Sequence, residues 1–371
     1  MMTNLPKDVV IGECWARDGL QNEERVVPTE AKVELITGMV DAGITRIEAT
    51  SFAHPKYLPQ FADAEEVLRR VPRRPGVHYR AICTTERAVE RAVRSKAEGF
   101  GVDELAFVLS ASDTHNRANV DMSQGENMRL LEKLARRALD TGHEVFGWVL
   151  CSFGCPITGD VPVMDALRIG QWWKNLGARY IGFGDTTGSA NPRQADEFFT
   201  LALDRGFTPD ETVVHFHDTR GWGVANSLVG LTKGLRYFDS SLGAIGGQPK
   251  TGAARYDRGH TGNTCTEDLV GMFEEMGVST GVALPKLLHL GARAEQVLGR
   301  RLRSNFLLAG PSRTRASRGT SSAASSRRPS SPRRSPRRRP PRARDASLIF
   351  VSRRHLSAIN SPRFDAYITR Q

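Results

Sequence analysis

The 371-residue sequence lacks several features that would assign it to whole classes of protein. No run approaches the roughly 18 consecutive apolar residues of a membrane-spanning helix, so we expect no contact with a membrane. The first eight residues lead directly into an apolar run, which predicts that no signal or transit peptide is present. Five cysteines are too few for a disulfide scaffold in a chain of this length, and a reducing cytoplasm is the expected location.

Acidic residues are nearly absent from the C-terminal segment. Residues 311–371 contain 16 arginines but only two acidic residues, Asp345 and Asp365, so this segment has a net charge of +14. Because the whole chain has a net charge of +11, residues 1–310 have a net charge of −3. Ser, Pro and Arg supply 36 of these 61 residues, and such a segment buries too little apolar surface to offset its ordering entropy. We therefore predict one domain in residues 1–310 and a disordered tail in 311–371.

Two interpretations of this tail compete. Arginine runs such as residues 337–339 suit phosphate backbones, which would fit a nucleic-acid-binding protein built on an inactive barrel. No aromatic residue is interleaved with that run for base stacking, however. We favour a non-functional extension, such as the product of a frameshift in GC-rich coding sequence, because such frames are rich in Arg, Ser, Pro and Ala. Nucleic acid is accordingly not an expected partner.

Between residues 7 and 300, short apolar or β-branched runs alternate with longer helical patterns, as in strand–helix units around a parallel sheet. Strands are predicted at residues 9–13, 44–48, 79–83, 104–109, 145–150, 180–183, 212–217 and 237–241. Helical patterns include residues 29–42 and 127–140. Helices are expected to end at Gly43, Gly142, Gly177 and Gly206.

Eight such units in about 250 residues predict an α/β fold, the TIM (β/α)8 barrel. The alternative is an open doubly wound sheet, but neither glycine-rich nucleotide-binding motif of such sheets follows the first strand. Residues 284–303 are predicted to form extra helices outside the barrel.

Polar residues gather where predicted strands end, which is the active-site face of a TIM barrel. Residues 17–23 follow the first strand, 48–52 end the second, 184–188 end the sixth and 215–219 end the seventh. His215 and His217 are two positions apart on one strand, so both imidazoles face the barrel mouth. This pair favours a metal site, although two satisfied interior histidines are the alternative.

Asp18 is the natural anionic ligand for that site, unless it caps the turn that follows. Two imidazoles and a carboxylate without thiolate favour Mg²⁺ or Mn²⁺ over Zn²⁺. Cys151 and Cys155 are interpreted as space-filling rather than redox-active. Arg17, next to Asp18, suits a reaction that passes through an enolate or oxyanion, and a structural ion pair with Glu48 or Asp185 is the compatible alternative.

Five ordered motifs resemble a known family. They are RDGLQNE at 17–23, IEATSF at 47–52, GDT at 184–186, HFHDT at 215–219, and GN at 262–263 with TEDL at 266–269. Together they resemble 3-hydroxy-3-methylglutaryl-CoA lyase, of the DRE-TIM metallolyase superfamily, over residues 7–300. The resemblance implies that Asp18, His215, His217 and Asn263 bind the divalent metal.

The resemblance also implies a reaction, the retro-Claisen cleavage of a hydroxymethylglutaryl-CoA-like acyl-CoA to acetyl-CoA and acetoacetate, as in leucine degradation. The metal would lower the pKa of the C3 hydroxyl so that a base takes its proton. Arg17 would stabilise the enolate, His215 would serve catalysis as well as the metal, and Glu48 and Asp185 would support the metal site and proton transfers. The expected partners are an acyl-CoA substrate and further copies of the chain, in a homodimer or higher homo-oligomer.

One departure concerns the loop after the eighth strand, where the family reads Gly-Gly-Cys-Pro and this chain has Gln248 at the cysteine position. Glutamine cannot donate a proton as a thiol does. The loop, residues 248–261, is also longer than expected of the family. Either His260 or water replaces the thiol, or this longer loop selects another acyl group. Arg17, Gln21, Gln248, Lys250 and Arg255 are the expected substrate-binding residues, with loop cations such as Arg258 either binding CoA phosphates or merely solvated.

Two further alternatives remain. A Claisen condensing enzyme of the same superfamily shares the Arg-Asp-Gly and His-x-His motifs but has Gly-Glu-Gln where this chain has residues 19–21, and it carries a folded regulatory domain. The other is the inactive barrel with a nucleic-acid-binding basic tail.

Overall fold

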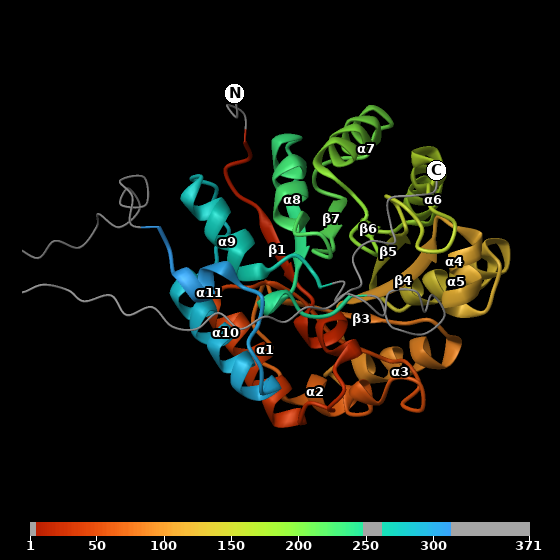
Figure 1. Cartoon of the computed structure of the whole chain (residues 1–371). Helices are drawn as coiled ribbons and strands as arrows, with labels where there is room; N and C mark the ends of the chain where they lie inside the picture. Colours follow the sequence, from red (N-terminus) through yellow and green to blue (C-terminus); the bar gives the residue numbers. More distant parts are fainter. Residues whose placement is uncertain (1–4, 248–261, 313–371) are drawn as a thin grey trace, which may run out of the picture. The chain divides into compact units, whose positions relative to one another are not determined.

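The predicted strands form a closed parallel barrel in the computed structural model, each pairing with its neighbours in chain order and β1 pairing with β8 (Figure 1). The structure describes residues 5–247 and 262–312. The strands are β1 (Val10–Glu13), β2 (Arg46–Ser51), β3 (His78–Ile82), β4 (Glu104–Ser110), β5 (Glu144–Leu150), β6 (Tyr180–Asp185), β7 (Thr212–Phe216) and β8 (Tyr237–Ser240). The TIM-barrel prediction is therefore confirmed, with strand ends displaced by at most a few residues.

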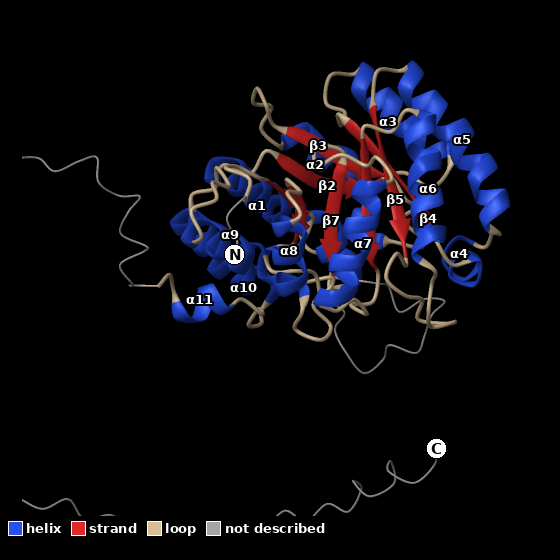
Figure 2. Ribbon diagram, turned by 90° about the horizontal axis from the view of Figure 1, so that it is seen from above, coloured by secondary structure: helices blue, strands red, loops and turns tan. Residues whose placement is uncertain are grey.

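Helices surround the strands, as the view from above shows (Figure 2). They are α1 (Thr29–Ala42), α2 (Ala64–Arg70), α3 (Glu86–Ala97), α4 (Asp113–Val120), α5 (Gln124–Asp140), α6 (Val163–Leu176), α7 (Pro192–Asp204), α8 (Gly223–Thr232), α9 (Thr266–Glu275), α10 (Leu284–Leu298) and α11 (Asn305–Ala309). Gly43 and Gly177 end α1 and α6 in the left-handed conformation, at φ 105° and 97°, as expected of helix-terminating glycines.

Within the range predicted to hold extra helices, residues 284–303, the structure has one helix, α10, and a second short helix, α11, begins just beyond that range at Asn305. Helix α10 packs against α1, where Gly38 makes room for the side chain of Leu290. Within the described residues, no helix is long and apolar enough to span a membrane. The predictions for Gln248, Lys250, Arg255, Arg258 and His260 fall in residues 248–261 and lie outside the described residues, as do those for residues 313–371.

The barrel interior is aromatic and charged rather than filled with aliphatic side chains. Phe146, Trp148, Tyr180 and Tyr237 form a buried cluster there with smaller apolar residues. Charged side chains from other strands complete the filling, and Arg80 is the most enclosed cation among them, at 2% exposure. Charged groups are buried almost exclusively when paired, so this interior requires a network of ion pairs.

Candidate active site

The turn after β1 carries two of the predicted site residues, Arg17 and Asp18, in a π-helical segment, Trp15–Gly19. Buried Glu13 anchors this turn, because its Oε1 accepts hydrogen bonds from the Trp15 amide (2.8 Å) and the Leu242 amide (3.0 Å). Its Oε2 pairs with the Thr266 hydroxyl at 2.6 Å. Burial raises the pKa of Glu13 to about 8. Glu13 thus joins the start of the site to the segments that follow β8.

Asp18, His215 and His217 converge at the C-terminal mouth of the barrel, with one potential ligand atom each, all within 4.8 Å of one another. The Nε2 atoms of the two histidines lie 3.0 Å apart, and Nε2 of His217 lies 3.8 Å from Oδ2 of Asp18. Ligands about 2.1 Å from one Mg²⁺ and at right angles to each other lie about 3 Å apart. The spacing of the two imidazoles therefore fits a shared divalent ion.

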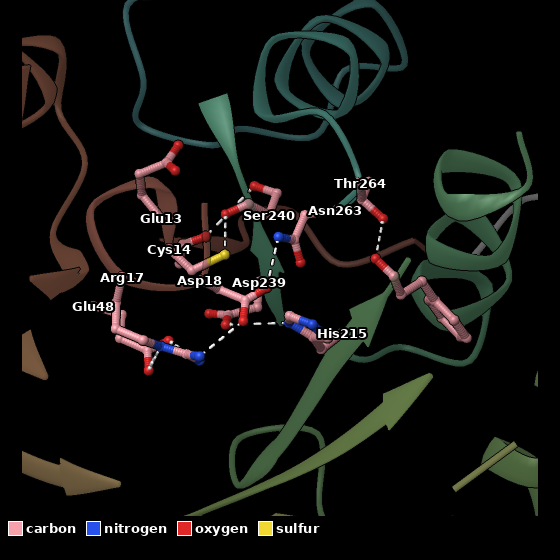
Figure 3. Close-up of polar contacts among 12 residues, drawn as sticks. Glu13, Cys14, Arg17, Asp18, Glu48, His215, Asp239, Ser240, Asn263 and Thr264 are labelled. Atoms are coloured by element: carbon pink, nitrogen blue, oxygen red, sulfur yellow. Dashed lines mark hydrogen bonds and ion pairs between the residues drawn. The ribbon is translucent and has the colours of Figure 1, made fainter. Parts of the chain in front are cut away.

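Asn263 completes this cluster from the segment after β8 (Figure 3). Its amide nitrogen donates to Oδ2 of Asp18 and to the carbonyl of Ile245, both at 2.8 Å. Its Oδ1 is buried and has no hydrogen-bond partner among the described residues. A buried amide oxygen without a donor is costly, and an oxygen-seeking cation would satisfy it. The donor set as a whole thus fits a divalent metal.

The protonation states of these ligands also suit a metal. Burial, together with the neighbouring His215, lowers the pKa of His217 to about 4, so this imidazole is neutral near pH 7. Burial, the largest influence, would by itself raise the pKa of Asp18, but the charge of Arg17, the two neighbouring histidines and the hydrogen bond from Asn263 together hold that pKa below its ordinary value. Metal ligation requires a neutral imidazole and an ionised carboxylate, and both are present without any proton having to leave.

Arg17 is held by carboxylates on two sides. Its Nε and Nη2 donate to the two carboxylate oxygens of Glu48, at 2.7 and 3.0 Å, and its Nη1 donates to Oδ1 of Asp18 at 2.7 Å. Gln21 lies on the same guanidinium edge, with its Oε1 3.4 Å from Nη1. The predicted ion pair of Arg17 is therefore with Glu48, and not with Asp185.

A second layer of charge lies below this one, in the barrel interior. Nη2 of Arg80 contacts Oε2 of Glu48 at 3.2 Å and the two carboxylate oxygens of Asp239 at 3.1 and 2.9 Å. Asp239 in turn lies 3.5 Å from Nδ1 of His215. The sequence analysis did not identify Arg80, Asp239 and Glu13 as residues of the site. All three are charged residues within predicted strands, and a charge at such a position could have indicated a buried ion pair inside the barrel.

Asp185 ends β6 beside the strand that carries the histidines. Its two carboxylate oxygens accept hydrogen bonds from the backbone amides of Ser189 (2.7 Å) and Ala190 (3.1 Å). Asp185 therefore stabilises the turn that follows β6. Burial raises the pKa of Asp185 to about 6, so the group exchanges its proton near neutrality. The structure therefore places Asp185 next to the cluster without a hydrogen bond to Arg17 or to the ligand set among the described contacts.

A second cluster of potential metal ligands, His78, Glu104 and Glu144, lies at the opposite end of the barrel. The Arg46 guanidinium already bridges Glu104 and Glu144, so we interpret this cluster as a network of ion pairs. Cys151 and Cys155 are buried free thiols after β5, and the sulfur of Cys155 accepts the amide of Ile157 at 3.4 Å.

A closed (β/α)8 barrel with Asp18, His215, His217 and Asn263 at its C-terminal mouth defines a class, the TIM-barrel enzymes whose metal centre is built on strand ends. The same mouth carries a fixed cation, Arg17, within hydrogen-bond distance of a candidate ligand. A cation fixed at this position is suited to stabilise negative charge that develops beside it.

Comparison with known proteins narrows the class. The model of the HMGL-like family matches residues 9–293, and the chain therefore belongs to that family. A hydroxymethylglutaryl-CoA lyase of Bacillus subtilis is 37% identical over 302 residues, 81% of this chain and 97% of the relative. The mitochondrial hydroxymethylglutaryl-CoA lyase of Bos taurus is 36% identical over 304 residues, 82% of this chain and 90% of the relative.

A solved structure gives the same assignment. An HMG-CoA lyase of Acinetobacter baumannii, crystallised with coenzyme A and 3-methylmalate, superimposes with a TM-score of 0.76 at 35% identity, covering 83% of this chain and 97% of that one. The resemblance identified from the motifs is thus confirmed.

Proposed function

We propose that this protein is a carbon–carbon lyase that cleaves 3-hydroxy-3-methylglutaryl-CoA to acetyl-CoA and acetoacetate. The observation that carries the proposal is the position of Arg17, whose guanidinium is fixed by Glu48 and contacts the candidate ligand Asp18. Retro-Claisen cleavage leaves a thioester enolate, and a preorganised cation stabilises such an anion most effectively in a site of low polarity. Membership of the HMGL-like family supports the same reaction.

Asp18, His215, His217 and Asn263 would hold a divalent metal, which when bound supplies Lewis-acid polarisation of the substrate oxygens. The absence of thiolate from this set supports Mg²⁺ or Mn²⁺ over Zn²⁺. Removal of the metal by chelation, followed by separate addition of Mg²⁺, Mn²⁺ and Zn²⁺, tests this choice through the recovered activity.

The chain's own residues supply the remaining functions. Arg17 stabilises the enolate oxygen, and Glu48 keeps the guanidinium in place through its two-pronged contact. Asp185, with a pKa of about 6, is able to take up and release a proton near neutral pH, which supports a role in proton transfer. Gln21 lies beside Arg17 and is suited to orient the substrate.

The deciding experiment is an assay of the purified protein with Mg²⁺ and hydroxymethylglutaryl-CoA, with products identified by mass spectrometry. Cleavage to acetyl-CoA and acetoacetate at ordinary enzyme rates is expected. A panel of other tertiary 3-hydroxyacyl-CoA thioesters runs in parallel, since Gln248 replaces the family's loop cysteine. Faster cleavage of another thioester would replace the proposed substrate.

The condensing direction is separated from cleavage by a second assay. Release of free thiol from acetyl-CoA in the presence of 2-oxo acids would identify a synthase, and we expect none.

Three finer proposals accompany the activity. A role in leucine degradation follows from the proposed substrate. A cytoplasmic location is supported by the five cysteines, all of them free and buried. A homodimer or higher homo-oligomer is proposed as well, and light scattering after size exclusion will measure its mass.

A further inference from the structure

Arg80 lies beneath the candidate active site and contacts none of the candidate metal ligands directly. It projects from β3 into the barrel, 2% exposed, between Glu48 of β2 and Asp239 of β8. Nη1 adds a longer contact of 3.5 Å to the Tyr237 hydroxyl. One guanidinium therefore bridges two carboxylates that come from β2 and β8, the two strands on either side of β1.

The guanidinium is also fixed by the aromatic filling of the barrel. Its central carbon lies 4.2 Å from the centre of the Phe146 ring and 5.4 Å from that of Trp148. Aromatic faces attract a cation most strongly where it is removed from solvent, and Arg80 is almost completely buried. The position of Arg80 is thus determined by packing and by charge together.

The backbone opposite leaves space for this pair. Gly12 of β1 faces Asp239, and a Cβ at that position would lie 2.1 Å from Oδ1 of Asp239. A side chain here would displace the carboxylate that Arg80 holds. The glycine, the aspartate and the arginine therefore form one matched arrangement across three strands.

Each carboxylate leads to a different part of the site. Glu48 holds Arg17 through two hydrogen bonds, and Asp239 lies 3.5 Å from Nδ1 of His215. We propose that Arg80 is a positioning residue, which fixes Glu48 and Asp239 and thereby sets the orientation of both Arg17 and His215. The proposal rests on the function proposed above as far as the kinetic effect is concerned, but its effect on metal binding does not depend on the substrate.

Stability alone does not account for this arrangement. Buried ion pairs are commonly replaced by well-packed apolar residues without loss of stability, because burying two charges costs as much as their attraction returns. Partners of a metal-ligating histidine, in contrast, affect metal affinity when they are changed. The two explanations make different predictions for the same variants.

The test compares Arg80→Met with Arg46→Met in the full chain. Arg46 is a second arginine of the barrel interior, paired with Glu104 at the end remote from the site, and serves as the matched control. The dissociation constant of Mn²⁺, measured from free Mn²⁺ by electron paramagnetic resonance, should rise about 10- to 100-fold in Arg80→Met. It should stay within about twofold of wild type in Arg46→Met.

Kinetics add a second measurement. Arg80 is expected to act on the reaction only indirectly, by holding Glu48 and Asp239 in place. Its loss should therefore misplace Arg17 and His215 without removing a contact to the substrate, so kcat at saturating metal should fall about 100-fold while KM changes little. Equal effects of the two methionine variants on Mn²⁺ binding would overturn the proposal. If the Mn²⁺ constants behave as expected but wild type does not cleave hydroxymethylglutaryl-CoA, the proposed function fails and the positioning role stands.

A double-mutant cycle with Asp239→Asn tests the route. If Arg80 acts through Asp239, the double variant should bind Mn²⁺ about as weakly as the weaker single variant, whereas additive effects would contradict the route. Circular dichroism and thermal unfolding verify that each variant folds. Should Arg80→Met fail to fold, Arg80→Lys keeps the charge but lacks the planar fork, and unchanged Mn²⁺ affinity and kcat in that variant would also overturn the proposal.

Discussion

Arg17 meets Glu48 through two hydrogen bonds and Asp18 through a third, and a lysine in its place would keep the charge but lose this geometry. We expect Arg17→Lys to lower kcat by about 10³-fold, since removal of one preorganised donor already costs about 10²- to 10³-fold. Steady-state kinetics at saturating metal measure the effect. Arg91→Lys is the matched control, because Arg91 makes the same two-pronged contact to Glu65, outside the barrel. A nearly active Arg17→Lys would remove Arg17 from the role assigned to it.

His215 has two partners, His217 at Nε2 and Asp239 near Nδ1. His215→Ala removes one candidate ligand, and we expect turnover to be abolished together with tight Mn²⁺ binding. Isothermal titration calorimetry with Mn²⁺ reports the second effect without substrate. His115→Ala is a control, since His115 is a buried histidine whose Nδ1 pairs with the Ser110 hydroxyl outside the ligand set. Retention of full Mn²⁺ affinity in His215→Ala would contradict the ligand assignment.

Glu13 makes the stability of the fold dependent on pH. Its pKa is raised by burial from 4.5 to about 8, so between these values the folded state holds a proton that the unfolded state has released. This contribution to stability is complete below pH 4.5 and is lost as the pH rises towards about 8. Glu13→Gln cannot lose that proton, so its free energy of unfolding should gain on that of wild type as the pH rises from 5 to 8.

The measurement is urea unfolding at several pH values. Each pKa unit corresponds to about 1.4 kcal/mol, and the folded and unfolded states differ by nearly one proton over most of the range from pH 5 to 8, so a relative gain on the order of 4 kcal/mol is expected. Exposed Glu86→Gln should show no such trend. A difference between wild type and Glu13→Gln that is independent of pH would show that Glu13 is ionised throughout.

At the scale of elements, the loop after β8 and the turn after β1 fit closely against each other. Gly246 adopts φ 94°, and a Cβ there would lie 2.3 Å from the backbone oxygen of Asp18. We expect Gly246→Ala to displace Asp18 and to weaken Mn²⁺ binding about 10-fold or more. Gly99 has φ 85° and open space around it, so Gly99→Ala shares the backbone strain without the contact. If both variants bind Mn²⁺ equally weakly, backbone strain alone, and not the contact with Asp18, would account for the loss of affinity.

The elements themselves were predictable from periodicity. Residues 29–42 carry a clear apolar period and end at Gly43, and the observed helix has the same bounds. Helix α4 was not predicted, because Asp113–Val120 is polar and its caps depend on the Ser112 hydroxyl rather than on an apolar face. The π-helical turn at Trp15–Gly19 has no sequence signature, and tertiary contacts with Glu13 and Ser240 stabilise its start.

The site was partly predictable for a related reason. Strand ends and a two-residue spacing located Asp18, His215 and His217, whereas Asn263 came only from the resemblance, since its segment follows a long loop. Arg80 and Asp239 were missed because a strand pattern marks alternate positions as inward-facing but does not pair them. Which charges meet inside a barrel depends on register between strands distant in sequence, such as the alignment of β1 with both β2 and β8.

For the whole molecule, the charge divides into −3 for residues 1–310 and +14 for 311–371. A stop codon after residue 312 keeps the contact between the Ser312 amide and Glu275, at 2.7 Å. We expect undiminished lyase activity in this truncated protein and loss of any salt-sensitive binding to DNA, measured by fluorescence anisotropy at two salt concentrations. Full DNA binding by the truncated protein would assign that binding to the barrel domain. Loss of lyase activity would instead assign a catalytic or folding role to the tail.

Closure of the barrel has a consequence for the order in which the protein becomes functional. Asp18 follows the first strand and Asn263 follows the last, 245 residues later, and the two side chains meet only because β1 pairs with β8. A growing or partly folded chain therefore has no complete ligand set, and a metal that binds the folded state alone shifts the equilibrium towards the closed ring. The ion would then act as a clasp between the two ends of the barrel, and its uptake would report that synthesis and folding of all eight strands are complete.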